Sequence, residues 1–260
     1  MSLTRREFIK LGGAAVVSLS FAERCYAGTV DIPVLMYHDV SHLTDETETV
    51  LPPRFAAQME WLYSEGYQAI FLEEVDTLDA KSAQRAVIIT FDDGYASFMD
   101  YAFPLFQNYG FKSTINIIGE HVGGFVAGDD PRLSWDECRF LIKSGIVEIG
   151  CHTYGLHTWY GRKPRSEAVR EFNEKLKQDL AVFQEVMTRE LGRPAKTLAW
   201  PYGMHDQKSI KIAKQAGFSF ILNSENRYFV KGGDRYDIPR LTVDHALDLQ
   251  QYREEIEMRP

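Results

Sequence analysis

Apolar runs and mixed polar stretches alternate along most of the chain. One run, Ala-Val-Ile-Ile-Thr-Phe, begins at Ala86 and is cut off by Asp92, Asp93 and Gly94. An apolar run that ends at a glycine is typical of a buried parallel strand followed by a turn. Similar runs predict strands at eight positions, namely Ile32, Gln68, Ala86, Ser113, Ile146, Thr197, Phe218 and Ile238.

The stretches between these runs have the pattern of helices. Pro52 and Pro53 open a helical pattern that stops at Gly66, and Ser134 and Glu137 have the spacing of a capping box. The longest helix is expected over residues 166–191. Glycines that relieve the left-handed strain of a helix end separate helix from strand at five places, Gly66, Gly110, Gly145, Gly192 and Gly217.

Alternating helices and buried strands predict an α/β fold with a parallel sheet and helices outside it. Seven or eight strands favour a distorted (β/α)7-8 barrel, closed or nearly closed, and a doubly wound sheet is the alternative. Because no shift in composition marks a second domain, residues 28–260 are expected to form a single domain.

The first 27 residues have the layout of an export signal. Arg5 and Arg6 precede a moderately apolar run over residues 11–21, and small residues follow up to Ala27. This order predicts a twin-arginine signal cut after Ala27, with a helix of the mature fold as the alternative. The apolar run is too short for a comfortable membrane span, so we expect a periplasmic or extracellular protein with no stable span once the signal is removed.

Charge and cysteine content narrow the function classes. Loss of the predicted signal removes four basic and two acidic residues, which takes the formal net charge from −8 to −10. A surface that acidic argues against nucleic acid as a partner. Cys25 leaves with the signal, whereas Cys138 and Cys151 remain and could pair in an oxidising compartment.

Chemically active side chains gather where predicted strands end. Two neighbouring carboxylates at the mouth of a buried strand repel each other, so a cation or a proton is expected beside Asp92 and Asp93. In a parallel barrel the carboxyl ends of the strands share one rim. The other groups on that rim would be His38, His152, His157 and the turn Trp200-Pro201-Tyr202-Gly203.

His152 and His157 are five residues apart, so they can meet at one ion only if a loop joins them. Gly155 permits such a turn. Either histidine alone would be interpreted as a core or surface residue. Two imidazoles and one carboxylate, however, make a three-ligand site with an open position, which is the arrangement of a hydrolytic zinc centre.

The motifs resemble those of the polysaccharide deacetylases of carbohydrate esterase family 4, which have the NodB-homology fold. Thr90-Phe91-Asp92-Asp93-Gly94 matches the first motif of that family residue for residue, and His152-Thr153 opens the second. A second histidine five residues on is similar to the branch that deacetylates poly-N-acetylglucosamine. Trp200-Pro201-Tyr202-Gly203 looks like the third motif, without the arginine that most members carry upstream. The resemblance extends from about Ile32 to Val243.

This resemblance implies a role for each motif residue. Asp93, His152 and His157 would hold a divalent metal, Zn²⁺ first and Ni²⁺, Co²⁺ or Fe²⁺ as alternatives. Asp92 would remain ionised beside the cation and act as the base. The metal and the backbone N–H of Tyr202 would hold the oxyanion.

The general acid has two candidates. His38 would protonate the departing amine, as the first-strand histidine does in the biofilm branch, where the motif order is permuted. His245 is the competing candidate. It follows Leu241 near the C-terminus, as the histidine of the family's late Leu-x-His motif follows a leucine, but not at the spacing of that motif.

Several residues are candidates for the substrate site. Trp200, Tyr154 and Tyr202 could stack on sugar rings or belong to the core, with Pro201 between them in the turn. Arg240 could reach the rim and orient Asp92, although its position is also that of a surface arginine.

Three functions therefore compete. The first is metal-dependent removal of N-acetyl groups from an N-acetylglucosamine polysaccharide or oligosaccharide, with release of acetate. The second is hydrolysis of another amide or ester, such as peptidoglycan sugars, xylan acetate or a small cyclic amide. The third is a non-catalytic carbohydrate-binding protein, against which the full set of Asp92, Asp93, His152 and His157 argues.

Overall fold

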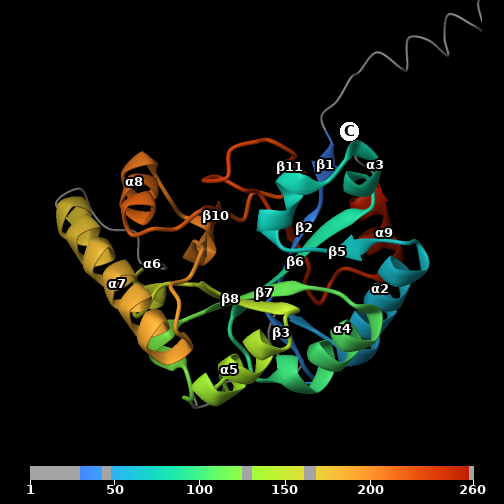
Figure 1. The fold of residues 1–260 in the computed structure, drawn as a ribbon, viewed down its shortest axis with the longest axis horizontal. Helices are drawn as coiled ribbons and strands as arrows, with labels where there is room; N and C mark the ends of the chain where they lie inside the picture. The colour runs from blue at the N-terminus through green and yellow to red at the C-terminus, as the bar shows by residue number, and fades with distance from the viewer. Residues whose placement is uncertain (1–29, 43–47, 125–130, 161–167, 258–260) are drawn as a thin grey trace, which may run out of the picture. The chain divides into compact units, whose positions relative to one another are not determined.

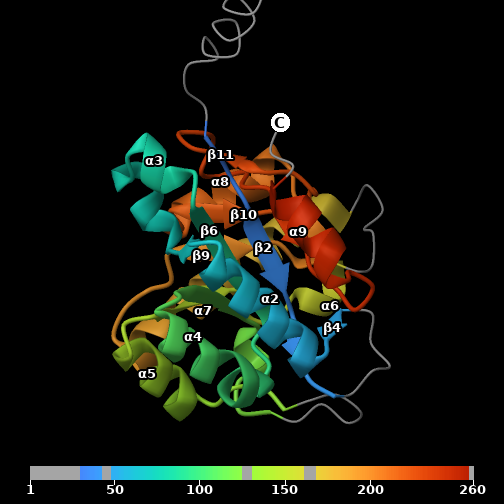
Figure 2. The ribbon, with the colours of Figure 1, turned by 90° about the vertical axis from the view of Figure 1, so that its right-hand side faces the viewer.

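The computed structural model describes residues 30–42, 48–124, 131–160 and 168–257. The predicted export signal, residues 1–27, lies outside them. Asp31–Pro260 form one compact unit, in which helices surround a curled sheet (Figures 1 and 2).

The sheet is parallel throughout its main path. Its strand order is β10 (Phe220–Leu222), β9 (Thr197–Ala199), β8 (Val147–Cys151), β7 (Ser113–Ile117), β6 (Ala86–Asp93), β2 (Val34–Tyr37) and β12 (Leu241–Thr242), and β5 (Gln68–Ala69) pairs with the start of β6.

A parallel bridge between Leu222 and Ile238 brings the chain just before β12 back beside β10. The two edges of the curled sheet are thereby joined by one segment. The predicted distorted (β/α) barrel is confirmed.

Two small pairs of strands and an outer layer of helices complete the unit. β1 (Asp31–Ile32) pairs antiparallel with β11 (Phe229–Val230), and β3 (Asp39–Val40) pairs with β4 (Thr49–Val50). The helices are α2 (Pro52–Ser64), α3 (Ala80–Ala83), α4 (Phe103–Tyr109), α5 (Trp135–Lys143), α6 (His157–Tyr160), α7 (Ala168–Leu191), α8 (Gln207–Gln215) and α9 (Leu249–Glu257). Figure 1 shows α7, α5, α4 and α2 along the outer side of the sheet.

Local sequence signals account for the helix boundaries. The predicted capping box is present, because Ser134 Oγ accepts from the N–H of Glu137 and the Glu137 carboxylate accepts from the N–H of Ser134. The five glycines predicted to end helices all have positive φ, between 69° and 94°.

The alternation of side chains along β6 positions the first catalytic candidate. Phe91 packs against Phe55 of α2, Phe106 of α4 and Phe98, with ring centroids 5.0–6.0 Å apart. Because successive strand residues point to opposite faces, Asp92 points away from these helices, to the inner face of the sheet.

The predicted loop between the two histidines is present, since residues 153–156 lie outside helices and strands and His157 is the first residue of α6. The left-handed residue of this loop is Thr153 (φ 71°). Two other local predictions differ from the structure. The first is the last predicted strand, which begins at Leu241, while Ile238 makes only a single bridge.

The second difference concerns the cysteines. Cys138 and Cys151 are both buried and free, so the predicted possibility of a disulfide between them is not realised.

Candidate active site

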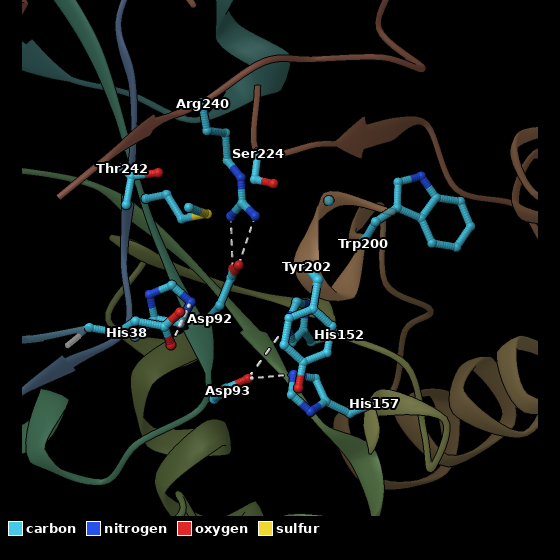
Figure 3. Close-up of a pocket in the computed structure, with 13 residues that line it drawn as sticks. His38, Asp92, Asp93, His152, His157, Trp200, Tyr202, Ser224, Arg240 and Thr242 are labelled. Atoms are coloured by element: carbon cyan, nitrogen blue, oxygen red, sulfur yellow. Dashed lines mark hydrogen bonds and ion pairs between the residues drawn. The ribbon is translucent and has the colours of Figure 1, made fainter. Parts of the chain in front are cut away.

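Asp92, at the carboxyl end of β6, is paired with a buried arginine. Arg240 Nη1 donates to Asp92 Oδ1 at 2.8 Å and Nη2 donates to Oδ2 at 2.7 Å, and the two side chains are only 1% and 2% exposed. Figure 3 shows this two-pronged contact. Burial raises the pKa of Asp92, but the charges of Arg240, His152 and His38 and the hydrogen bonds from Arg240 together outweigh it, and the pKa of the carboxyl lies well below its usual value.

This contact decides between the two interpretations of Arg240. It is a buried partner of Asp92 and not a surface arginine, and the carbonyl of Asn223 accepts from its Nε at 2.8 Å. The arginine missing upstream of Trp200 is thus replaced by one from the segment between β10 and β12. The base candidate has the cationic partner that the third motif lacks.

Asn116 is a second partner of Asp92 that the sequence analysis did not single out. It lies opposite Asp92 in the β6–β7 register, is fully buried, and donates from Nδ2 to Asp92 Oδ1 at 2.8 Å. Gly150 lies opposite Asn116 on β8, where an added Cβ would stand 2.2 Å from Asn116 Oδ1. The available sequence signal was an asparagine between Ile115 and Ile117, near the carboxyl end of the strand.

Asp93 faces the two histidines instead of Arg240. Its Oδ1 lies 3.5 Å from Nε2 of His152 and 3.5 Å from Nε2 of His157, and one ligand atom from each residue lies within 4.8 Å of the others. Asp93 Oδ1 is buried and has no hydrogen-bond partner. A buried carboxylate oxygen without a partner between two imidazoles fits a bound cation, so these residues suit a metal ion.

Both histidines are prepared to act as ligands through Nε2. His152 Nδ1 lies 2.9 Å from the carbonyl of Ala199, which can only accept, so the proton is on Nδ1 and the lone pair is on Nε2. Burial and the neighbouring His152 lower the pKa of His157 to about 4. A neutral imidazole is the form that binds a metal.

Strained backbone occurs at three positions of the site. Among the described residues, the non-glycine residues with positive φ are Asp93 (69°), Thr153 (71°) and Tyr202 (56°). Left-handed conformations at such residues persist only where the surroundings hold them, and they concentrate at functional sites. At Asp93 the left-handed turn breaks the alternation of the strand, which sends its carboxylate in a different direction from that of Asp92.

The loop that carries the histidines is held by a carboxylate from α7. Asp179 accepts from the backbone N–H groups of Tyr154 and Gly155, each at 2.7 Å. Burial raises the pKa of Asp179 above its usual value. The sequence analysis missed Asp179. Its signal was its position on the apolar stripe of the helix, between the buried Leu176 and Leu180.

Replacing Asp179 with alanine is expected to weaken metal binding about 10- to 100-fold, because the loop between His152 and His157 loses its backbone acceptor. The measurement is Zn²⁺ affinity by competition with a chromogenic chelator. Glu185→Ala, an exposed carboxylate on the same helix, is the matched control and should leave the affinity unchanged. Equal affinities for Asp179→Ala and the control would show that the loop holds itself.

The aromatic candidates divide between the pocket and the core. Trp200, although only 1% exposed, lines the pocket together with Tyr202, which is 58% exposed and has its ring 5.2 Å from that of His157. Pro201 and Tyr154 are not among the lining residues. Tyr154 instead packs against the core, with its ring over Gly119, so the structure does not bring it to the pocket.

The pocket has a volume of about 260 Å³ and opens over these groups. His38 lines it, and its Nε2 lies 3.6 Å from the carboxylate of Glu48. His245 does not line it, and its backbone carbonyl accepts from Arg54 of α2. The structure therefore brings His38 to Asp92 and Asp93, and does not bring His245 there (Figure 3).

Comparison with known proteins decides the family. The polysaccharide deacetylase family model matches residues 79–221, which is more than half of the chain. The chain belongs to the polysaccharide deacetylase family. A curated relative, the poly-beta-1,6-N-acetyl-D-glucosamine N-deacetylase of Staphylococcus aureus (strain MSSA476), is 26% identical over 197 residues, which cover 75% of this chain and 68% of the relative.

Solved structures agree on the fold. The deacetylase PplD of Streptococcus pyogenes, solved in complex with acetate, superposes with a TM-score of 0.73 at 19% identity, covering 88% of this chain and all of that one. IcaB from Ammonifex degensii gives 0.71 at 24% identity, covering 87% and 95%.

The predicted enzyme class is thereby confirmed, and the chain is a polysaccharide deacetylase related to the deacetylases of poly-N-acetylglucosamine. Within the part of the chain that the structure describes, every helix is too short or too polar to cross a membrane.

Proposed function

We propose that this enzyme removes N-acetyl groups from an N-acetylglucosamine polysaccharide by metal-dependent hydrolysis and releases acetate. The observation that carries the proposal is the separation of the two adjacent carboxylates. Asp92 accepts hydrogen bonds from Arg240 and Asn116 and keeps a free acceptor site on Oδ2, whereas Asp93 Oδ1 has no hydrogen-bond partner and lies 3.5 Å from each imidazole Nε2. One carboxylate is built to remain an ionised base and the other to bind a cation.

Asp93, His152 and His157 would hold the ion, most simply Zn²⁺, with Ni²⁺, Co²⁺ or Fe²⁺ as alternatives. When bound, a divalent ion supplies Lewis acidity toward the acetyl carbonyl and lowers the pKa of water at the site. The protein orients His152 through the Ala199 carbonyl and supports the loop that leads to His157 through Asp179.

Asp92 takes the proton of the attacking water. Its charge is maintained by the guanidinium of Arg240, and its orientation is set by three donated hydrogen bonds, two from Arg240 and one from Asn116. A carboxylate held in this way needs no reorganisation when the proton is transferred.

The backbone N–H of Tyr202 donates to the oxyanion as the tetrahedral centre forms. Tyr202 follows Pro201 in the 3₁₀ turn Pro201–Gly203. Two hydrogen bonds keep this turn closed: the Gly203 N–H donates to the Trp200 carbonyl (2.9 Å), and the Met204 N–H donates to the Pro201 carbonyl (3.2 Å).

His38 protonates the departing amine. Its Nε2 faces Glu48 at 3.6 Å, and its Nδ1 is buried without a hydrogen-bond partner. Collapse of the tetrahedral centre then yields acetate and the free amine of a glucosamine unit.

Replacing His38 with alanine is expected to lower kcat about 10²- to 10⁴-fold, because the amine would leave without a positioned proton donor. His245→Ala should leave kcat within about twofold, since His245 does not line the pocket. Steady-state acetate release measures both variants. If the His245 variant were dead and the His38 variant active, the acid would come from the other side of the fold.

The substrate proposal is tested by comparing oligomers. Acetate release should be fastest from β-1,6-linked N-acetylglucosamine oligomers, the linkage named for the Staphylococcus aureus relative. Chitin oligomers, peptidoglycan fragments and acetylated xylan are the competing substrates. Faster release from any of these would reassign the substrate, and release from none would reject the proposed reaction.

Residues 1–27 are proposed to be a twin-arginine export signal, leaving residues 28–260 as one catalytic domain in the periplasm or outside the cell, where its polysaccharide partner would be. The intact mass of the mature protein tests this cleavage and should equal that of a chain that begins at Gly28. A mature protein that begins at the initiator methionine would contradict it.

A further inference from the structure

His205 follows the Trp200-Pro201-Tyr202-Gly203 turn and has no role in the mechanism above. Its Nδ1 lies 2.9 Å from the carbonyl oxygen of Gly203, and its Nε2 lies 3.1 Å from Oδ1 of Asp237. The ring therefore bridges the turn and Asp237.

Asp237 is tied to the buried side of the site. The Nδ2 of Asn223, a residue that is 1% exposed, donates to the same Oδ1 of Asp237 at 2.6 Å. The backbone carbonyl of Asn223 accepts from Arg240 Nε. A series of contacts therefore runs from the Gly203 carbonyl to the arginine that holds Asp92. The step from His205 to Asp237 is an ion pair, and the other steps are hydrogen bonds.

The turn at the start of this chain of contacts needs support. Tyr202 (φ 56°, ψ 17°) and Gly203 (φ 65°) are two successive left-handed residues, and a non-glycine residue in that conformation persists only where its surroundings hold it. Gly203 is also pressed against Ser224, where an added Cβ would stand 2.0 Å from Oγ.

We propose that His205 is a positioning residue that clamps this turn to Asp237, so that the Tyr202 N–H points at the oxyanion while the same network holds Arg240 on Asp92. The inference rests on the proposed function, in which that N–H meets the oxyanion. The near-parallel rings of His205 and Trp200, 8° apart in plane, place the clamp directly behind the pocket wall.

The kinetic test compares His205→Ala with Asp237→Asn. His205→Ala should lower kcat about 10- to 100-fold, the cost of a displaced catalytic donor, with KM within about twofold and bound metal unchanged. The double variant His205→Ala with Asp237→Asn should have a kcat no lower than that of His205→Ala alone, because each change breaks the same contact between His205 and Asp237. Asp76→Asn, which breaks an exposed ion pair with Arg235, is the control and should leave kcat unchanged.

A conservative variant isolates the contact with Asp237. In His205→Asn the amide Nδ2 takes the place of the ring Nδ1, so it can donate to the Gly203 carbonyl but cannot reach Asp237. Its kcat should stay about 10- to 100-fold below that of wild type, as for His205→Ala, because the turn is no longer tied to Asp237. A wild-type kcat in His205→Asn would overturn the clamp.

A readout that needs no activity is amide hydrogen exchange at Gly203 and Met204, whose N–H groups donate to the Trp200 and Pro201 carbonyls. Exchange at both should be at least about tenfold faster in His205→Ala and unchanged in the control. If wild type released acetate from no sugar, the proposed function would fail while exchange still tested the clamp. Unchanged exchange in His205→Ala, or a kcat loss matched by loss of metal, would overturn the inference.

Discussion

Replacing Asp93 with asparagine is expected to abolish stoichiometric metal binding and to lower kcat for acetate release by at least about 10³-fold, because several kcal/mol of carbonyl polarisation are lost with the ion. The variant removes the one anionic ligand from between His152 and His157. An amide oxygen at the same place has no net charge to offset the cost of burying a cation.

Elemental analysis of the purified variant and steady-state acetate release measure the two effects together. Asp100→Asn, an exposed carboxylate shortly after the same strand, is the control and should retain both metal and activity. Full metal content in Asp93→Asn would contradict the assignment of the ligands, whatever happened to the rate.

Replacing Arg240 with methionine is expected to lower the free energy of unfolding by about 3–5 kcal/mol. Both members of the pair with Asp92 are almost completely buried, so the variant leaves a carboxylate without its partner in a low-dielectric interior. The double variant Arg240→Met with Asp92→Asn should recover much of this loss, because no unpaired charge remains buried.

Urea unfolding of the wild type and the two variants measures these differences. Arg235→Met is a matched control, because Arg235 pairs with Asp76 at 2.8 Å but both side chains are about half exposed. The control should cost less than about 1 kcal/mol. Similar losses for Arg240→Met and Arg235→Met would mean that burial of the Asp92 pair contributes nothing special to stability.

The sequence predicted the parts of the site that depend on local signals. Asp92 and Asp93 end an apolar strand, and His152 follows another, so the common rim of a parallel sheet brought them together without any knowledge of packing. The glycines after the helices and the capping box at Ser134 were equally local, and all of them are present.

What the sequence could not supply depends on register and on contacts between distant segments. Asn116 reaches Asp92 only because the β6–β7 register sets the two residues opposite each other, and a shift of one residue would turn the amide to the other face. Asp179 meets the histidine loop through tertiary packing of α7. Arg240 could be suggested from its place near the end of the chain, but its burial follows from the way the segment at Ile238 joins β10.

Turn conformations were the least predictable. Gly155 was expected to permit the loop between the histidines, and a loop does join them, but its left-handed residue is Thr153. Propensity favours glycine at positive φ, so no local signal pointed to Thr153. An added Cβ at Gly155 would stand 2.7 Å from the Glu120 carboxylate, so this glycine answers a close contact rather than a left-handed conformation.

The most direct test of metal-dependent deacetylation is acetate release from a β-1,6-linked N-acetylglucosamine oligomer before and after removal of the metal. Wild-type protein dialysed against a chelator until no divalent ion is detected should fall below about 1% of its initial rate and recover when one equivalent of Zn²⁺, Ni²⁺, Co²⁺ or Fe²⁺ is returned. Asp93→Asn treated in the same way should not recover. Metal-free wild-type protein that releases acetate at the original rate would contradict the role assigned to Asp93, His152 and His157.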